Sequence, residues 1–309
     1  MTTILITGGT GMIGTQLTKM LTEKGYEIII LTRNASEVKH SLPGVSYANW
    51  DIKKQTIDTD AIAKSDHIIH LAGAGVADKR WTEKRKQEIV NSRTHSSALI
   101  VKALKEIPNK IKTVVSASAI GWYGPDTTDS KQGGFTENAK ADTAFLGETC
   151  RLWESGIEPV EQLNKRLVKL RTGIVLSNEG GALAEFKKPL KGFVAAILGD
   201  GKQVASWIHV EDLCRMYLSA IENEKINGVY NAVAPNPVTN KELVLTLAKQ
   251  MRGNFFIAIH VPAFALKIAL GEMSIEVLKS ATVSSQKIRS AGFEFHYPTI
   301  ETAFTDLIK

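Results

Sequence analysis

Hydrophobic positions in the first half of the chain alternate between short continuous runs and stretches with helical spacing. The continuous runs predict strands, and the spaced stretches predict helices. Strands that are apolar along their whole length are typical of a parallel sheet covered on both faces, and strands alternating with helices indicate right-handed crossovers. The predicted strands are residues 4–7, 26–31, 67–71, 113–117 and 168–171, and the predicted helices are 12–24, 82–104 and 146–153. The pattern therefore predicts an α/β fold with a doubly wound parallel sheet.

This alternation ends near residue 172. Glycines cluster at Gly180-Gly181 and again from Gly199 to Gly201, and the chain beyond Pro235 reads as helical pieces separated by prolines and glycines. We predict a Rossmann-type domain over residues 1–171, completed by 205–232. Residues 172–204 and 233–309 would form a smaller mixed lobe with a C-terminal extension.

Composition narrows the class of protein. Of the 309 residues, 43% are hydrophobic and 23% are charged, which excludes a disordered or fibrous chain. The net charge of +6 suits anionic ligands, and an ordinary solvated surface is the alternative explanation. The sequence has no dense Lys/Arg run of the kind that indicates nucleic-acid binding. The two cysteines, Cys150 and Cys214, cannot make a disulfide framework and have no CxxC spacing, which favours a reducing compartment. No run approaches the ~18 apolar residues of a membrane span, and no signal peptide is present, so we expect a cytoplasmic protein without membrane contact.

The strongest motif is Gly8-x-x-Gly11-x-x-Gly14, which lies between the first strand and the first helix. Glycines allow a tight turn and let the backbone approach a diphosphate, and the helix N-terminus offers unpaired N–H groups. An ordinary glycine-rich turn is the alternative, but the strand before and the helix after the motif favour dinucleotide binding.

The end of the second strand indicates which dinucleotide. An NAD site usually has an acidic residue about 20 residues past the glycines. Thr32 and Arg33 occupy this region, and the first acid is Glu37. A guanidinium binds a 2′-phosphate that a carboxylate would repel, so the motif favours NADP(H) over NAD(H). The alternative is an exposed arginine at the start of a helix.

Taken together, several motifs resemble the extended short-chain dehydrogenase/reductases, which include the nucleoside-diphosphate-sugar epimerases and dehydratases. Further motifs, and a tail from Pro262 to Phe304, resemble one branch of uncharacterised "epimerase family" proteins that have a dedicated C-terminal extension. The superfamily motifs are the glycine loop with Thr7, Leu71-Ala72-Gly73, Ser116-Ala117-Ser118 with Tyr123-Gly124, and Trp207-Ile208-His209-Val210-Glu211-Asp212. The branch motifs are Asp78-Lys79-Arg80-Trp81, Asn91-Ser92-Arg93, Leu170-Arg171-Thr172-Gly173, Leu270-Gly271-Glu272-Met273 and Ala291-Gly292-Phe293.

The resemblance implies a role for each matching residue. The cofactor's diphosphate would lie on the glycine loop, its 2′-phosphate on Arg33, its adenine near Asp51, and its ribose beside the residues after the fourth strand. The full cofactor set is Gly8, Thr10, Gly11, Met12, Ile13, Gly14, Arg33, Asp51, Leu71, Ala72 and Gly73. Ser118 would face the nicotinamide and the reacting hydroxyl.

The superfamily's proton-transfer pair, Tyr-x-x-x-Lys, is missing. Phe145 and Thr149 stand at the two positions, and neither carries an ionisable group of the required kind. Three accounts stay open: another acid or base near Ser118, with Tyr123 first and Glu148 or His209 behind it; a reaction that needs little proton transfer; or NADP binding without turnover. Pocket-lining is the alternative role for Tyr123.

Candidate substrate contacts are Trp81, Arg93, Phe145 and His209. Trp81 could equally anchor its loop, Arg93 could form an internal ion pair, and His209 could begin a helix whose early acids suit the helix dipole. His67 and His70 lie on opposite faces of a strand, and no further ligands complete a site, so no metal is expected.

These observations favour an NADP-binding, epimerase-like oxidoreductase that transfers hydride to or from a small hydroxyl- or carbonyl-bearing substrate, with a sugar-linked compound as one option. The alternative is a non-catalytic NADP(H) sensor or scaffold. The superfamily often dimerises through the helices predicted near 92–104 and 146–153, which makes a homodimer an open expectation.

Overall fold

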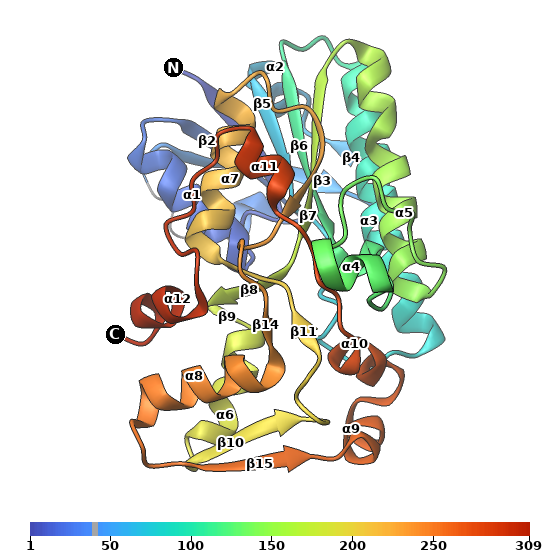
Figure 1. The fold of residues 1–309 in the computed structure, drawn as a ribbon. Coiled ribbons are helices and arrows are strands. Elements are labelled where there is room, and N and C mark those ends of the chain that lie inside the picture. Colours follow the sequence, from blue (N-terminus) through green and yellow to red (C-terminus); the bar gives the residue numbers. More distant parts are fainter. Residues whose placement is uncertain (39–42) are drawn as a thin grey trace.

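The computed structural model describes residues 1–38 and 43–309, and its central feature is an eight-stranded sheet (Figure 1). The strand order is β13 (Gly228–Ala232), β7 (Arg166–Thr172), β6 (Thr113–Ala119), β5 (His67–His70), β1 (Thr3–Thr7), β2 (Glu27–Thr32), β3 (Val45–Asp51) and β4 (Thr56–Ile57). All neighbours pair in parallel except β4, which is antiparallel to β3. The chain builds outward from β1 in both directions, so the strand order reverses between β1 and β5. The predicted α/β class with a Rossmann-type parallel sheet is confirmed.

Helices cover both faces of this sheet because its strands are apolar on both sides. Ile4 and Ile6 of β1 pack with α1 (Met12–Glu23) and α7 (Val210–Glu222). Leu5, between them in sequence, points to the opposite face and packs with α2 (Thr59–Lys64), α3 (Glu83–Glu106) and α5 (Phe145–Ile157). The predicted long helix over 82–104 is α3, which extends to Glu106.

The smaller lobe lies below the carboxyl ends of the large sheet in Figure 1. It contains three small sheets: β12 (Trp207–His209) with β8 (Ile174–Ser177) and β9 (Gly180–Gly181), β10 (Val194–Leu198) with β15 (Ile257–Val261), and β11 (Val204–Ala205) with β14 (Val238–Thr239). Its helices are α6 (Ala182–Leu190), α8 (Asn240–Arg252), α9 (Ala263–Leu270), α10 (Ser274–Leu278) and α12 (Ile300–Leu307). The expectation of only helical pieces beyond Pro235 is wrong, because β14 and β15 pair with strands far earlier in the chain.

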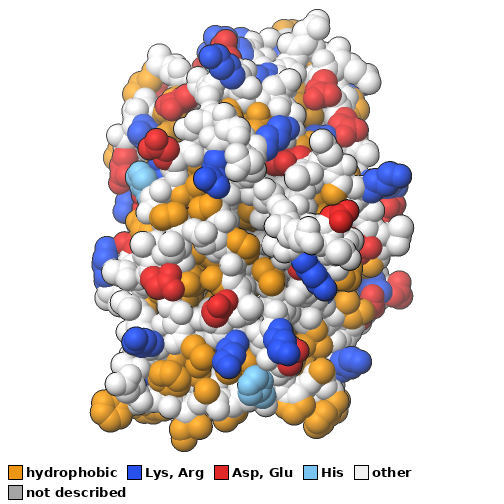
Figure 2. Space-filling view, in the orientation of Figure 1, with side chains coloured by type: hydrophobic (Ala, Val, Ile, Leu, Met, Phe, Trp, Pro, Cys, Tyr) orange, Lys and Arg blue, Asp and Glu red, His pale blue; other side chains and the backbone are white. Residues whose placement is uncertain are grey.

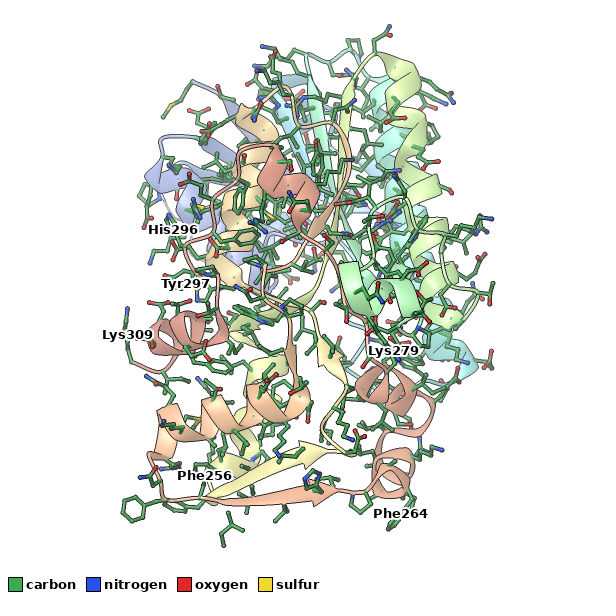
Figure 3. The ribbon with its side chains drawn as sticks, viewed as in Figure 1. Phe256, Phe264, Lys279, His296, Tyr297 and Lys309 are labelled. Carbon is green, nitrogen blue, oxygen red and sulfur yellow. The ribbon has the colours of Figure 1, made fainter. Side chains whose placement is uncertain are left out.

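The C-terminal segment returns from the lobe to the large sheet. Here α11 (Gln286–Ser290) lies along β13, and Phe293 joins the core beneath α7. The buried carboxylate of Asp212, on α7, accepts hydrogen bonds from the backbone N–H groups of His296 and Tyr297, both at 2.9 Å. Figure 3 labels these two residues beside α7. The tail is therefore fastened to the helices and strands of the large sheet as well as to the lobe.

The remaining elements connect these layers. They are α4 (Thr128–Gly133), η1 (Ala35–Glu37), η2 (Ile120–Trp122), η3 (Glu158–Leu163) and η4 (Gly271–Met273). None of the helices in the described ranges combines the length and apolar character that a bilayer crossing needs. On the face drawn in Figure 2, basic and acidic side chains are interspersed rather than gathered by sign.

Candidate dinucleotide site and the neighbouring polar network

The glycine loop between β1 and α1 is packed so closely that side chains would not fit. Gly8 has a φ of +70°, and a Cβ there would lie 3.0 Å from the carbonyl carbon of Leu71. A Cβ on Gly14 would overlap the carbonyl oxygen of Gly8 and lie 2.6 Å from the Cα of Gly9. The glycines therefore let α1 approach both its own loop and the end of β5.

The N-terminus of α1 is open to an anion. Gly11 is the N-cap residue and makes no side-chain capping bond, and the first turn contains no acidic residue. Thr10 and Gly11 are exposed, whereas Met12 and Ile13 are half-buried. The backbone N–H groups of this turn and the positive end of the helix dipole would meet a diphosphate placed here. The loop therefore fits the dinucleotide that its sequence predicts.

A buried hydrogen-bond junction fixes the point where β1 and β5 diverge. The Thr7 hydroxyl accepts from the N–H groups of Leu71 (3.1 Å) and Ala72 (3.2 Å), so its proton faces Nδ1 of His70 at 2.7 Å. The other ring nitrogen of His70 then donates to Ser96 at 3.2 Å. Burial lowers the pKa of His70 to about 4, which keeps the ring neutral. His70 is thus a structural residue, and the described residues contain no cluster that could hold a metal.

Arg33 and Asp51 lie at the ends of neighbouring strands. Arg33 follows β2, is exposed, and has no ion-pair partner in residues 1–38 and 43–309. Asp51 ends β3 and accepts hydrogen bonds from the N–H groups of Lys53 (2.8 Å) and Lys54 (3.0 Å), which lower the pKa of its carboxyl. The Asp51 carboxylate therefore shapes a turn, while the guanidinium of Arg33 is available to a ligand.

The loop after β5 is closed by aromatic packing. Trp81 is 8% exposed, donates its indole N–H to the carbonyl of Val76 at 2.9 Å, and meets the ring of Phe145 edge-on at 4.9 Å between centroids. Lys86 lies 5.5 Å from the Phe145 ring centroid and pairs with Glu272 of η4 at 2.6 Å. Trp81 and Phe145, both predicted to contact substrate, are therefore brought together, and the C-terminal extension reaches the same place.

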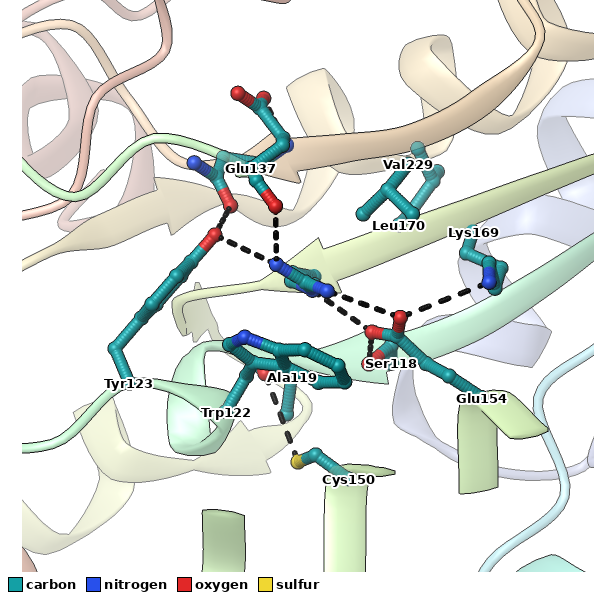
Figure 4. A network of polar contacts seen from close by, with 12 residues as sticks. Ser118, Ala119, Trp122, Tyr123, Glu137, Cys150, Glu154, Lys169, Leu170 and Val229 are labelled. Carbon is teal, nitrogen blue, oxygen red and sulfur yellow. Dashed lines mark hydrogen bonds and ion pairs between the residues drawn. The ribbon is translucent and has the colours of Figure 1, made fainter. Parts of the chain in front are cut away.

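A network of polar side chains fills the space between β6, β7 and α5 (Figure 4). Arg171 binds Glu154 through two nitrogens, at 2.8 and 3.1 Å, and donates to the Tyr123 hydroxyl at 3.1 Å. The Ser118 hydroxyl donates to the same carboxylate at 2.7 Å. The Tyr123 hydroxyl donates to Asn231 at 2.6 Å. Each of these groups finds its partners inside the protein, as a buried network requires.

This network gives Ser118 and Tyr123 surroundings that differ from those expected. Ser118 is 2% exposed and Tyr123 is fully buried, so neither hydroxyl faces open space. Burial also raises the pKa of Tyr123 to about 12, which disfavours proton release near neutral pH. Glu154 engages the Ser118 hydroxyl, and Arg171 and Asn231 engage the Tyr123 hydroxyl. The contact of these hydroxyls with a substrate stays a prediction.

Glu148 and His209, the other two candidates for acid–base chemistry, lie outside this network. Glu148 is half-exposed on α5 and pairs with Arg151 at 2.6 Å. His209 is the N-cap of α7, where its Nδ1 accepts the N–H of Glu211 at 3.1 Å, and it stacks on Tyr297. His209 is 2% exposed, and Asp306 of α12 approaches it at 3.4 Å. The alternative role of His209 at the start of a helix is confirmed, and its contact with a substrate stays a prediction.

Sequence reasoning did not single out Glu154 as a functional residue. Its only sequence signal was its place directly after Trp153, the last residue of the predicted helix. The role of Glu154 depends on Arg171, whose strand pairs with β6 through the register Ser118 to Arg171. That register is a tertiary feature.

The fold and the glycine loop define a dinucleotide-binding α/β protein. Residues 4–144 match the model of the NAD dependent epimerase/dehydratase family, and residues 261–307 match a domain of unknown function, DUF1731. The epimerase family protein YfhF of Bacillus subtilis is 37% identical over 306 residues, which cover 99% of this chain and 97% of that protein. The chain therefore belongs to the NAD-dependent epimerase/dehydratase family, in the branch of epimerase family proteins with a DUF1731 extension.

Two solved structures extend the comparison. The human epimerase family protein SDR39U1, crystallised with NADPH, superposes with a TM-score of 0.84 at 26% identity, and the match covers 99% of both chains. UDP-glucose 4-epimerase of Thermotoga maritima, with UDP-glucose, has a TM-score of 0.79 at 20% identity and 99% coverage of this chain and 97% of its own, and shares the fold.

Proposed function

We propose that this protein is an NADP(H)-dependent oxidoreductase of the epimerase type that acts on a small substrate bearing a hydroxyl or carbonyl group. Sugar nucleotides are the first class to test, because UDP-glucose accompanies one structure of the same fold. The family is NAD-dependent in its description, and one relative was crystallised with NADPH. When bound, the cofactor supplies hydride transfer at its nicotinamide.

The observation that carries this proposal is the pairing of the open glycine loop with a guanidinium, at the end of the next strand, that has no ion-pair partner among the described residues. The loop residues Gly8, Gly11 and Gly14 would hold the diphosphate through backbone N–H groups. Arg33 would hold the 2′-phosphate, and no carboxylate among the described residues competes for it.

The test is the nucleotide selectivity of Arg33→Ala. A hydrogen bond to a charged group contributes about 1.5–3 kcal/mol, so NADPH affinity should fall about 10- to 150-fold while NADH affinity changes less than about 3-fold. Arg289→Ala removes another exposed arginine, on α11, and is the matched control. Equal losses for both nucleotides would remove the NADP preference, and a wild-type protein that binds neither would overturn the function.

A non-catalytic NADP(H) sensor is the second candidate, and one specific observation favours it. Phe145 and Thr149 replace the proton-transfer pair, and the Thr149 hydroxyl donates a hydrogen bond to the carbonyl of Phe145 at 2.6 Å. Hydride exchange between NADP(H) and a panel of keto and hydroxy compounds separates the candidates. Tight nucleotide binding without any exchange would favour the sensor.

In either case, we propose that Ser118 and Tyr123 position the strand ends rather than exchange protons with a ligand. The Ser118 hydroxyl ties β6 to Glu154 on α5, and the Tyr123 hydroxyl, just after η2, donates to Asn231 on β13. Ser118→Ala should therefore lower stability more than it lowers nucleotide affinity.

A further inference from the structure

Arg93 is a buried cation that no carboxylate of the described residues neutralises. It lies on α3 and is 8% exposed. One terminal nitrogen, Nη1, donates to the carbonyl oxygens of Ala74 and Ile89, both at 3.0 Å. The guanidinium carbon lies 4.8 Å from the ring centroid of Trp153. These contacts position the guanidinium but supply no formal negative charge.

The other buried arginines in the described residues do have carboxylate partners. Arg85, at 7% exposure, pairs with Glu88 at 2.7 Å. Arg171, at 2% exposure, pairs with Glu154 at 2.8 Å. Within residues 1–38 and 43–309, no carboxylate lies within ion-pair distance of Arg93. The sequence alternative of an internal ion pair for Arg93 is therefore not realised.

Arg166 shows what a guanidinium satisfied by carbonyl groups looks like. It is half-buried at the amino end of β7 and also lacks a carboxylate partner in the described chain. Its two terminal nitrogens, however, donate to the carbonyls of Ala220 (2.6 Å), Ile226 (2.7 Å) and Ile221 (3.0 Å), as well as to one hydroxyl. For Arg93, hydrogen bonds within the described chain involve Nη1 alone, which leaves donors for a ligand.

Arg93 also lies beside the predicted cofactor site. A Cβ on Gly73 would lie 3.2 Å from the guanidinium carbon, and Gly73 itself is exposed. The two residues before it, Leu71 and Ala72, flank Gly8 of the diphosphate loop. In open α/β sheets, ligands bind at the carboxyl ends of the strands near the point where strand order reverses. That point lies between β1 and β5, where Gly73 follows β5.

A buried charge is costly unless a partner compensates it. An oxyanion is the natural partner, because a guanidinium offers it two parallel charge-assisted hydrogen bonds. We propose that Arg93 binds a phosphate or carboxylate group of the ligand at the carboxyl end of β5. This inference rests on the proposed function and deepens it, since it requires an anionic group next to the glycine loop. That group belongs either to the cofactor diphosphate or to an anionic substrate.

The experiment compares wild type, Arg93→Gln, Arg93→Lys and the control Arg166→Gln. NADPH affinity is measured by fluorescence titration, and inorganic phosphate is titrated calorimetrically into the apo and NADPH-loaded proteins. If the cofactor supplies the oxyanion, Arg93→Gln weakens NADPH about 10- to 100-fold. If the substrate supplies it, NADPH affinity stays within about 2-fold, and phosphate binding to the loaded protein is lost. Arg166→Gln should change neither affinity.

The inference fails if Arg93→Gln matches wild type in both titrations. It fails equally if wild type binds no phosphate and Arg93→Gln leaves NADPH affinity unchanged. Should Arg93→Gln fail to fold, Arg93→Lys decides, because it keeps the charge but loses the planar fork and should still weaken the same ligand about 10-fold. A wild-type protein that binds no nicotinamide nucleotide overturns the proposed function instead. The phosphate titration of the apo protein then decides the Arg93 inference.

Discussion

The first helix approaches its own loop so closely that a Cβ on Gly14 would meet backbone atoms, and Gly14→Ala tests whether that approach makes the dinucleotide site. The added Cβ would overlap the carbonyl oxygen of Gly8 and lie 2.6 Å from the Cα and 2.8 Å from the carbonyl carbon of Gly9. All three are backbone atoms, which cannot rotate away. Because ordinary contacts begin at 3.4 Å, the loop and the helix must separate by about 1 Å.

A displacement of this size removes hydrogen bonds between the first turn of α1 and a diphosphate. Two lost bonds to a charged group correspond to about 3–6 kcal/mol, or at least about a 100-fold loss of NADPH affinity. Overpacking should cost a further 1–3 kcal/mol of stability, roughly, without unfolding the protein. Fluorescence titration with NADPH and urea denaturation measure the two effects separately.

Gly133→Ala is the matched control for this substitution. Apart from its chain neighbours and the backbone of its own helix, the described residues place no heavy atom within 4 Å of a Cβ at Gly133, which ends α4 without a positive φ. We expect unchanged NADPH affinity and equal or slightly higher stability, since alanine is the better helix former. If Gly14→Ala binds NADPH within about 3-fold of wild type, the close approach of loop and helix does not make the site, and the reasoning is refuted.

Two further predictions concern stability. Glu154→Gln breaks a pair with Arg171 in which both side chains are 3% exposed, so the free energy of unfolding in urea should fall by about 3–5 kcal/mol. Glu148→Gln breaks an exposed pair and should lower the free energy of unfolding by less than about 1 kcal/mol. Equal effects would contradict the role given to the buried network. Burial lowers the pKa of His70 to about 4 from an unfolded value near 6.5, so the unfolded chain holds more protons between these pH values. The free energy of unfolding should therefore fall by about 3 kcal/mol as the pH drops from 6.5 to 4. His70→Gln should remove this part of the pH dependence in urea titrations at several pH values, while the exposed control His95→Gln retains it. If the free energy of unfolding of His70→Gln depends on pH as steeply as that of wild type, another group titrates.

Local sequence predicted the elements whose hydrophobic pattern is complete within one segment of the chain. The strand over 4–7 and the long helix α3 were found because their buried residues repeat along a single segment. The strand β15 was missed, since it pairs with β10 more than 50 residues away in sequence and its side chains are largely exposed. Its hydrophobic pattern carried no clear signal of a sheet partner.

Candidate chemistry divides in the same way. The glycine loop depends on backbone conformation over eight consecutive residues, so its sequence was sufficient to predict its shape. Ser118 and Tyr123 are different, because whether their hydroxyls face a ligand depends on which groups from other elements reach them. Glu154, Arg171 and Asn231 come from three further elements and engage both hydroxyls.

The sequence by itself determined the parallel sheet, the diphosphate loop and an arginine without a competing acid at the end of the second strand, because each depends on residues close together in the chain. Only the tertiary structure decided that Arg93 lies beside Gly73 without a carboxylate and that Ser118 donates to Glu154. The physical reason is that the energy of a buried charge or hydroxyl depends on its neighbours in space. Here these neighbours are set by how α3 and α5 pack against the ends of β5, β6 and β7.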